Sequence, residues 1–378
     1  MSTHPKWLKR AGMLAGVLAL AVVFAVPAVA SASAGSEAAT WLGSQLKPEL
    51  TSNPAYCEGF AGGGPSVGQT LECSLAFKAA EMEAKSKATY KYAVAHFNEY
   101  IGSKSCSEGE AMRAGSVAKF ALGAEAVEHN PQNVGGRNLI SDLKCLQITS
   151  GPETGRFDDK GETEDFSNTF TQSLAIIALK ACEHGECPGS PNLKAWIEPA
   201  AKYLRAQQCE STSVSLSGAY RSTLGLKPTE CNANPPFEPE NLNAVEVDST
   251  GVAVQALLAE GSAASKTTAT KAVTWLKENN EHSVGPPATR LWKNYCNFEK
   301  ATEIFPSVNS TALASMAYLK DGLSIAEPKA WLTGIVNGQP AGKKGLPECT
   351  ASGEPNVFAT AQGIFGLEGV SYPSLVGV

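Results

Sequence analysis

One short pattern recurs along this chain of 378 residues: an alanine, two variable residues, an aromatic residue and a leucine. The clearest copies are AATWL at 38–42, AAKYL at 200–204 and AVTWL at 272–276. A variant, PKAWL, stands at 328–332, a degenerate copy, AVAHF, at 93–97, and a poor match lies within 138–147. A unit that recurs about every 50 to 70 residues is typical of helical repeats, which bury their apolar faces only by stacking on neighbours.

Each copy is followed by a second segment with a helical pattern, and this segment is more apolar than the first. Five of the six segments begin with Ser, Asp or Asn, whose side chains accept hydrogen bonds from the free amides of a first helical turn. Apolar and small residues cover nearly every face of these segments, as expected for helices that are packed on both sides. They begin at Ser66, Ala114, Ser167, Asp248, Asn309 and Asn356.

These pairs predict an all-α fold, because runs of alternating β-branched residues are nearly absent. Six hairpins with amphipathic outer helices and apolar inner helices close into an (α/α)6 toroid; an open solenoid obeys the same packing rules and is the alternative. We expect one toroid domain over residues 31–378, with repeat units near 38–85, 88–128, 138–182, 192–260, 266–322 and 327–369.

The N-terminus predicts export. Basic residues precede an apolar run that ends in small residues, and Ala28-Val29-Ala30 is the first plausible cleavage site, so residues 1–30 read as a signal peptide. A retained anchor helix is the alternative, because the run is long enough to cross a bilayer. After cleavage no stable membrane span is expected, and the protein is predicted to be secreted or held in the cell envelope.

An exported chain with ten cysteines is expected to form disulfides. Their order suggests that neighbours pair within local units, although sequence does not fix the connectivity. A metal site at the Cys182–Cys187 stretch lacks a second ligand pair, so a disulfide is preferred there. The suggested pairs are Cys57 with Cys73, Cys106 with Cys145, Cys182 with Cys187, Cys209 with Cys231, and Cys296 with Cys349.

The formal net charge of −6 and the lack of a basic cluster beyond the N-terminus argue against a nucleic-acid partner. The sequence instead predicts a monomer with a mildly acidic surface.

The repeats resemble those of the terpenoid cyclase and protein prenyltransferase superfamily, which includes the squalene-hopene cyclases. The resemblance is carried by the outer-helix pattern, by inner helices that start [SDN]-x-T, and by loops that run from Gln147 to Gly155-Arg156-Phe157 and from Gln208 to Gly218-Ala219-Tyr220. It implies the toroid fold and an isoprenoid as one class of ligand.

In the squalene-hopene cyclases an Asp-x-Asp-Asp-Thr-Ala motif supplies the proton. Here the matching stretch is Glu246-Val247-Asp248-Ser249-Thr250-Gly251, so the first and last acids are replaced. Asp248 is therefore expected to cap its helix, and a proton-donor role for it is the sharper alternative. The zinc ligands of the prenyltransferases have no counterpart, and no cofactor or metal is expected.

Glycan-active toroids offer a different chemistry, in which two carboxyl groups face each other. The candidates are Asp165, Glu246 and Asp248, which precede or begin inner helices whose N-termini meet at one rim of a toroid. Loop aromatics that could contact a ligand are Phe157, Tyr220, Trp292 and Tyr295.

The degraded motif favours a non-catalytic protein that binds a small or extended ligand in the central cavity or at its rim. A divergent cyclase using Asp248, a glycan hydrolase or lyase using paired carboxylates, and a structural cell-envelope protein are the alternatives. The ligand is expected to be a small molecule, an isoprenoid or a glycan.

Overall fold

The computed structural model describes residues 32–48, 55–59, 64–102, 105–108, 111–161, 164–185, 187, 192–211, 216–232, 244–279, 281–284, 289–295, 304–349 and 353–378. Contacts divide the chain into two units, Met1–Ala32 and Ser33–Val378. The predicted signal peptide lies outside the described residues, and everything that follows concerns the second unit.

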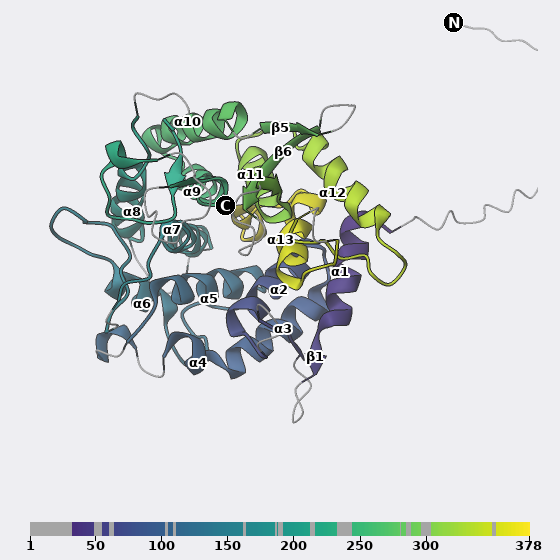
Figure 1. The fold of residues 1–378 in the computed structure, drawn as a ribbon. Helices are drawn as coiled ribbons and strands as arrows, with labels where there is room; N and C mark the ends of the chain where they lie inside the picture. Colours follow the sequence, from purple (N-terminus) through teal and green to yellow (C-terminus); the bar gives the residue numbers. More distant parts are fainter. Residues whose placement is uncertain are drawn as a thin grey trace, which may run out of the picture. The chain divides into compact units, whose positions relative to one another are not determined.

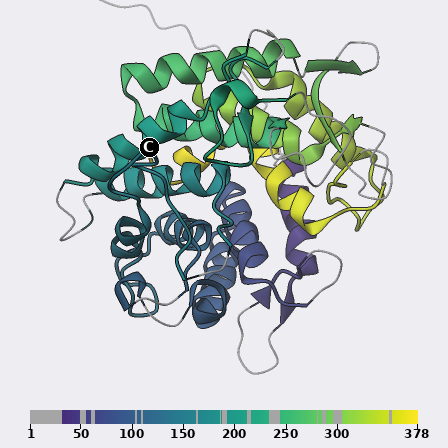
Figure 2. The ribbon, with the colours of Figure 1, turned by 60° about the vertical axis from the view of Figure 1, so that its left-hand side comes forward.

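Six helices form an inner ring in which each helix packs on the next and the last returns to the first (Figure 1). Six outer helices surround them, and the two layers are also visible from the side in Figure 2. Among the described residues no helix is long and apolar enough to cross a membrane. The inner helices are α2 (Val67–Ala79), α5 (Ala114–Ala126), α7 (Thr169–His184), α9 (Val247–Glu260), α11 (Val308–Lys320) and α13 (Val357–Glu368); the outer ones are α1 (Ala34–Gln45), α3 (Glu83–Ala95), α6 (Leu139–Leu146), α8 (Lys194–Ala206), α10 (Ala263–Asn279) and α12 (Ala326–Gly338).

This arrangement confirms the predicted all-α toroid of six hairpins. Most inner-helix residues are buried alanines, small polar residues or aliphatic residues, because these helices touch neighbours on every side. Gly251 shows why small residues are needed: a Cβ atom there would lie 2.9 Å from the carbonyl oxygen of Leu313 on α11. The close approach of α9 and α11 therefore depends on a glycine at this position.

A buried polar residue in the first turn of most inner helices ties the preceding loop to the ring. In α9, the Thr250 hydroxyl accepts a hydrogen bond from the amide of Tyr220 (2.9 Å) and donates to the carbonyl of Glu246 (2.6 Å). The equivalent residue of four other inner helices also accepts a hydrogen bond from a loop amide. These pairs are Thr70 with the amide of Cys57, Gln172 with that of Phe157, Thr311 with that of Trp292 and Thr360 with that of Leu346.

Two of these loops also cross over the next outer helix at a glycine. Gly155 and Gly218 have φ angles of +98° and +97°, and a Cβ atom on either would lie within 2.6 Å of a carbonyl oxygen of α8 or α10. The side chains of Gln147 and Gln208 fix the crossing by donating to the carbonyls of Trp196 and Thr268. Sequence repeats in the loops thus translate into repeated loop geometry.

Short strands were not predicted. Strands β5 (Glu281–Val284), β6 (Thr289–Tyr295) and β7 (Ile304–Pro306) form an antiparallel sheet between α10 and α11. Strands β1 (Lys47–Pro48) and β2 (Ala55–Tyr56) pair with each other, as do β3 (Tyr220–Arg221) and β4 (Val245–Glu246). Strands β1 to β4 have two residues each, and β5 to β7 carry no sustained alternation of apolar and polar residues, so no period of two stands out in the sequence. The remaining helices are the short α4 (Phe97–Ile101) and α14 (Tyr372–Leu375).

Four of the suggested disulfides are present: Cys57–Cys73, Cys106–Cys145, Cys182–Cys187 and Cys209–Cys231. Cys349 is also disulfide-bonded, and its suggested partner, Cys296, lies outside the described residues. Each of the four links residues at most 39 positions apart. The bridges are therefore local in sequence, and Cys106–Cys145 joins the segment before α5 to α6 of the next hairpin.

The segment after α13 turns into the centre of the ring, where the C-terminus lies in Figure 1. Its helix α14 contacts the inner helices α2, α7, α9 and α11. The Tyr372 hydroxyl donates to Glu72 (2.8 Å), its amide donates to Gln255 (3.1 Å), and its ring packs edge-on against Phe365. Lys320 at the end of α11 donates to the carbonyl oxygen of Val378 (2.7 Å). The C-terminal segment, residues 370–378, therefore fills the end of the ring where the inner helices finish.

Candidate functional site

One face of every inner helix looks into the ring. Counting the residue before each helix as the first, the third, seventh and tenth positions share a face of an α-helix. The contacts of Tyr372 with Glu72 and Gln255, at the seventh and tenth positions, identify this face as the central one. The third positions form the layer nearest the helix N-termini, which we call the entrance layer: Gly68, Gly115, Phe170, Asp248, Asn309 and Phe358.

Asp248 is the acid of the entrance layer. Its carboxyl accepts a hydrogen bond from the Ser310 side chain, while its Oδ1 atom is shielded from solvent and has no partner among the described residues. Burial raises the pKa of Asp248 to about 6. Such a carboxyl has spare hydrogen-bonding capacity in a place where leaving it unused costs free energy.

The prediction that Asp248 caps its helix is wrong. The residue before α9 is Glu246, and Asp248 lies within the first turn. The true equivalents of Glu246 are Ser66, Asn168, Ser307 and Asn356, each of which caps its own helix through its side chain.

Glu246 breaks that capping pattern, because its side chain makes no cap hydrogen bond. The carboxylate instead accepts from the Ser249 hydroxyl (2.8 Å). Burial, followed by the nearby charge of Asp248, raises the pKa of Glu246 to about 7 even though the Ser249 hydrogen bond lowers it. Glu246 and Asp248 thus form an acidic pair at the start of α9, and burial is the main cause that raises the pKa of both.

Two amide side chains with unused polar atoms lie near the same end of the ring. Asn309 donates to Gln362 (2.7 Å), but its Oδ1 atom has no hydrogen-bond partner among the described residues. The Nε2 atom of Gln69, in the first turn of α2, is likewise shielded and unpartnered. Both side chains are only 6% exposed. The unpaired oxygens of Asp248 and Asn309 mark the entrance layer as a place suited to a polar ligand, and Gln69 has an unpaired donor at the same end of the ring.

An ion pair lies one turn deeper. Lys119 contacts Glu72 at 2.6 Å, and the Tyr372 hydroxyl occupies the other carboxylate oxygen. Burial lowers the pKa of Lys119, but the charges of Glu72 and Tyr100 and the hydrogen bond with Glu72 together outweigh burial and raise that pKa. The two buried charges compensate each other, and the Tyr372 hydrogen bond joins the C-terminal segment to the pair.

Asp165 lies in a different cluster from Glu246 and Asp248. It forms an ion pair with Arg156 and accepts from the Ser167 amide (2.9 Å). Its neighbour Asp159 accepts from the Ala114 amide at the start of α5 (2.8 Å) and from Phe166 (3.1 Å). These contacts hold the loop before α7 against α5, so the structure gives Asp165 a loop-fixing role and does not bring it into a pair with Asp248.

Three of the four loop aromatics expected to contact a ligand are not exposed. Phe157, Tyr220 and Trp292 are fully buried, and the indole of Trp292 donates to the carbonyl of Leu276 (3.1 Å). Their backbone amides are the ones held by the inner helices, so these residues anchor loops to the core. Tyr295 belongs to β6, and its side chain lies outside the described part of the chain.

The sequence analysis missed Asn309, Phe170 and Phe358 as candidates. Phe170 and Phe358 are half-buried in the entrance layer, one on α7 and the other on α13. The sequence signal that could have identified them is the helical register. Each is the second residue of its inner helix, as Asp248 is in α9.

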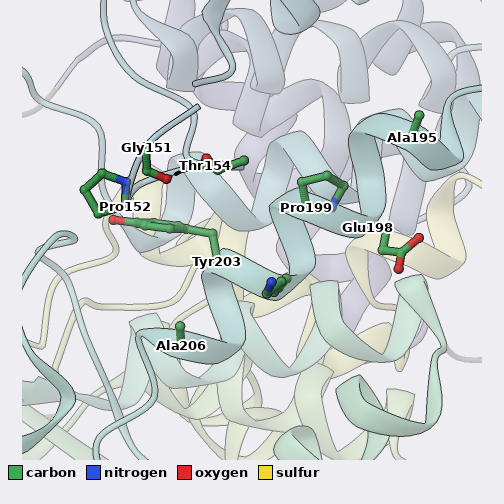
Figure 3. A pocket seen from close by; sticks show the side chains of 9 residues that line it. Gly151, Pro152, Thr154, Ala195, Glu198, Pro199, Tyr203 and Ala206 are labelled. Carbon is green, nitrogen blue, oxygen red and sulfur yellow. Dashed lines mark hydrogen bonds between the residues drawn. The ribbon is translucent and has the colours of Figure 1, made fainter. Parts of the chain in front are cut away.

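Two grooves lie on the outside of the ring. The larger, about 520 Å3, runs between α8 and residues 151–154, and Tyr203 points toward Pro152 across it (Figure 3). The second, about 420 Å3, is lined by Trp275 and Lys271 of α10. Tyr203 and Trp275 occupy the same position of the repeat, so these grooves are a product of the repeated loop crossing and do not single out a site.

One group among the described residues has metal-ligand geometry: Glu125 with Cys182 and Cys187. The two sulfurs are joined in a disulfide, so neither is a thiolate that could bind a metal. Burial raises the pKa of Glu125 to about 7, which is the expected effect of apolar surroundings.

Neither a protein-family model nor a curated protein sequence matches this chain. Solved structures do. An inactive variant of an α-1,6-mannanase from a Salegentibacter species, with two consecutive aspartates replaced and α-1,6-mannotriose bound, is similar over 90% of this chain and 98% of its own, with a TM-score of 0.60 and 12% identity. A family 76 glycoside hydrolase from a bovine Bacteroides thetaiotaomicron strain covers 91% of this chain and 76% of its own (TM-score 0.52, 10% identity). A bacterial glucoamylase complexed with acarbose covers 84% and 51% (TM-score 0.54, 14% identity).

These similarities contradict the predicted relationship to the terpenoid cyclase and protein prenyltransferase superfamily. Glycoside hydrolases match nearly the whole toroid, whereas the cyclase resemblance depended on short loop and helix-start motifs. Those motifs have a structural explanation here, since the glutamines, glycines and threonines hold loops onto helices. The chain has the (α/α)6 toroid fold of these glycan-active enzymes.

Proposed function

We propose that this protein hydrolyses a glycan outside the cytoplasm, with Glu246 as the general acid and Asp248 as the base or nucleophile. The observation that carries the proposal is the acidic pair at the N-terminal end of the ring, where a shielded oxygen of Asp248 has no partner among the described residues. The disulfides support an oxidising location.

The pKa values suit this division of roles. Glycoside hydrolysis needs one carboxyl group that is protonated and one that is ionised. With pKa values of about 7 for Glu246 and about 6 for Asp248, the glutamic acid keeps its proton in a range where the aspartate has lost its own. The pair as a whole therefore predicts a bell-shaped dependence of kcat/KM on pH, with a maximum between about 6 and 7.

The surroundings suit a sugar. Asn309 and Gln69 offer an acceptor and a donor to hydroxyl groups, while Phe170 and Phe358 provide partly exposed aromatic walls. A few placed polar groups among apolar surfaces are typical of small-ligand sites. The similar α-1,6-mannanase variant binds a mannotriose, which makes neutral oligosaccharides the first substrates to test.

The test is product formation from a glycan panel that includes α-1,6-mannan and an α-1,4-glucan, followed by chromatography of the released sugars. We expect the wild-type protein to release products from at least one glycan, and Glu246→Gln and Asp248→Asn to lower the rate at least about 100-fold. Asp321→Asn, at the opposite end of the ring, should leave the rate unchanged. Wild-type rates in Asp248→Asn, or no product from any glycan, would refute the proposal.

A further inference from the structure

Phe166 is exposed although it is large and apolar. Its side chain is 53% accessible, and among the described residues only one other large apolar side chain, Leu323, is exposed. Exposure of this much apolar surface to water is unfavourable. Phe166 lies two residues before the residue that caps α7, and Leu323 follows α11 at the other end of the ring.

The Phe166 ring is held in place rather than left loose. Its amide donates to Asp159 Oδ2 (3.1 Å), and Asp159 Oδ1 accepts from the Ala114 amide of α5 (2.8 Å). The guanidinium of Arg113, the residue before α5, lies 4.9 Å from the ring centroid. A cation over one face fixes the orientation of the ring, so its exposure is a built feature of this edge.

Phe166 lies close to an entrance-layer residue along the chain. It belongs to the loop that leads into α7, and Phe170 stands four residues later in the first turn of that helix. Phe170 is half-buried and belongs to the entrance layer. Two carboxylates of the same loop ion-pair with Arg156: Asp165, which directly precedes Phe166, and Asp158, eight residues before it.

We propose that Phe166 is an aromatic platform that stacks against a pyranose ring of the bound glycan at the edge of the site. The C–H groups on one face of a pyranose are weakly positive and apolar, which complements the electron-rich face of a phenyl ring. This subsite depends on the proposed glycan hydrolysis and extends it to a sugar outside the cleavage point.

The experiment measures binding by calorimetry in a Glu246→Gln background, where turnover is removed. The probes are α-1,6-mannotetraose and maltotetraose. Phe166→Ala should weaken binding about 5- to 30-fold, whereas Phe166→Tyr, which keeps the ring, should bind as the background does. Leu323→Ala is the matched control, because it removes the other exposed apolar side chain at the opposite end, and it should change nothing.

The outcomes separate the two proposals. If the background binds a probe and Phe166→Ala binds it equally well, the platform is refuted while glycan binding stands. If neither the background nor the wild-type protein binds either probe, the glycan function is contradicted and the platform with it. Equal losses in Phe166→Ala and Leu323→Ala would show a general surface effect and would also refute the platform.

Discussion

At the scale of single residues, a shift of two residues in the start of α9 decides whether Asp248 is a helix cap or a functional acid. Sequence patterns locate a helix start to within a few residues, and the Asp of Glu246-Val247-Asp248 is a good cap by residue type. The structure places Glu246 before the helix and Asp248 inside it, on the face that looks into the ring. The existence of an acidic helix start was predictable from the sequence, but the direction of its side chains was not.

Burial of Asp248 predicts a pH-dependent effect of Asp248→Asn on stability. The pKa of the folded state, about 6, lies above the ordinary value of 3.8, so the protonated form is favoured in the fold. The stability from protonation is fully present below pH 3.8 and is lost as the pH rises through 6. Asp248→Asn should therefore raise the Tm by about 2–5 °C at pH 7.5 and leave it unchanged at pH 3.5.

Scanning calorimetry of the wild-type protein and Asp248→Asn at pH 7.5 and pH 3.5 checks this prediction. The comparison at pH 3.5 is the control, because the two proteins should have the same Tm there. A Tm that falls in Asp248→Asn at both pH values would instead indicate that the carboxylate stabilises the helix start.

At the scale of elements, the repeated hydrogen bonds between loops and inner helices explain why the sequence repeats at all. The outer-helix pattern, the inner-helix starts and the Gln-to-Gly loops were all visible in the sequence and predicted six hairpins. Their three-dimensional role was not, because Phe157 and Tyr220 look like loop aromatics until the amides of both are seen bonded to Gln172 and Thr250. The β5–β7 sheet was also missed, since its strands carry no sustained alternation.

Thr250→Val tests the value of one such loop anchor. The substitution keeps the shape but leaves the buried amide of Tyr220 without its acceptor, so we expect a loss of about 1–3 kcal/mol in the free energy of unfolding. Thr274→Val on the exposed side of α10 is the control, because its hydroxyl bonds only within its own helix. Urea titration of both variants measures the difference, and equal stabilities would mean that the anchor contributes nothing.

Gly218→Ala tests the crossing of a loop over an outer helix. Its φ angle of +97° and a Cβ contact of 2.6 Å with the Lys271 carbonyl oxygen predict a loss of about 3 kcal/mol or more. Gly136→Ala has a positive φ angle of +83° but nothing within 4 Å, so only the backbone cost of about 1 kcal/mol is expected. Thermal melts that rank the two variants in the opposite order would contradict this account of the loop.

At the scale of the whole toroid, the C-terminal segment completes the core. The sequence SYPSLVGV at 371–378 does not predict that this segment enters the ring. Its polar contacts join Tyr372 to Glu72, 300 residues away in sequence, and to Gln255, 117 residues away. The ring closure itself was predictable from the repeats, whereas long-range contacts that fill the ring depend on where six separate helices converge.

Removal of residues 370–378 should therefore lower the Tm strongly, by about 5–10 °C, because it exposes Phe365 and leaves Glu72 with one partner fewer. Tyr372→Phe removes only the hydroxyl and should cost about 1–2 kcal/mol. Differential scanning calorimetry compares the three proteins. A truncated protein that melts like the wild type would show that the segment only rests on the ring.

The central claim, that the acidic pair at the N-terminal end of the ring acts on a glycan, is tested most directly by a crystal structure of Asp248→Asn with an oligosaccharide that the wild-type protein cleaves. The account predicts that a glycosidic oxygen lies inside the ring, within hydrogen-bond distance of residue 248 or Glu246, with sugar hydroxyls on Asn309 or Gln69. A sugar found only in the outer groove beside Tyr203, with the entrance layer free of it, would contradict the claim.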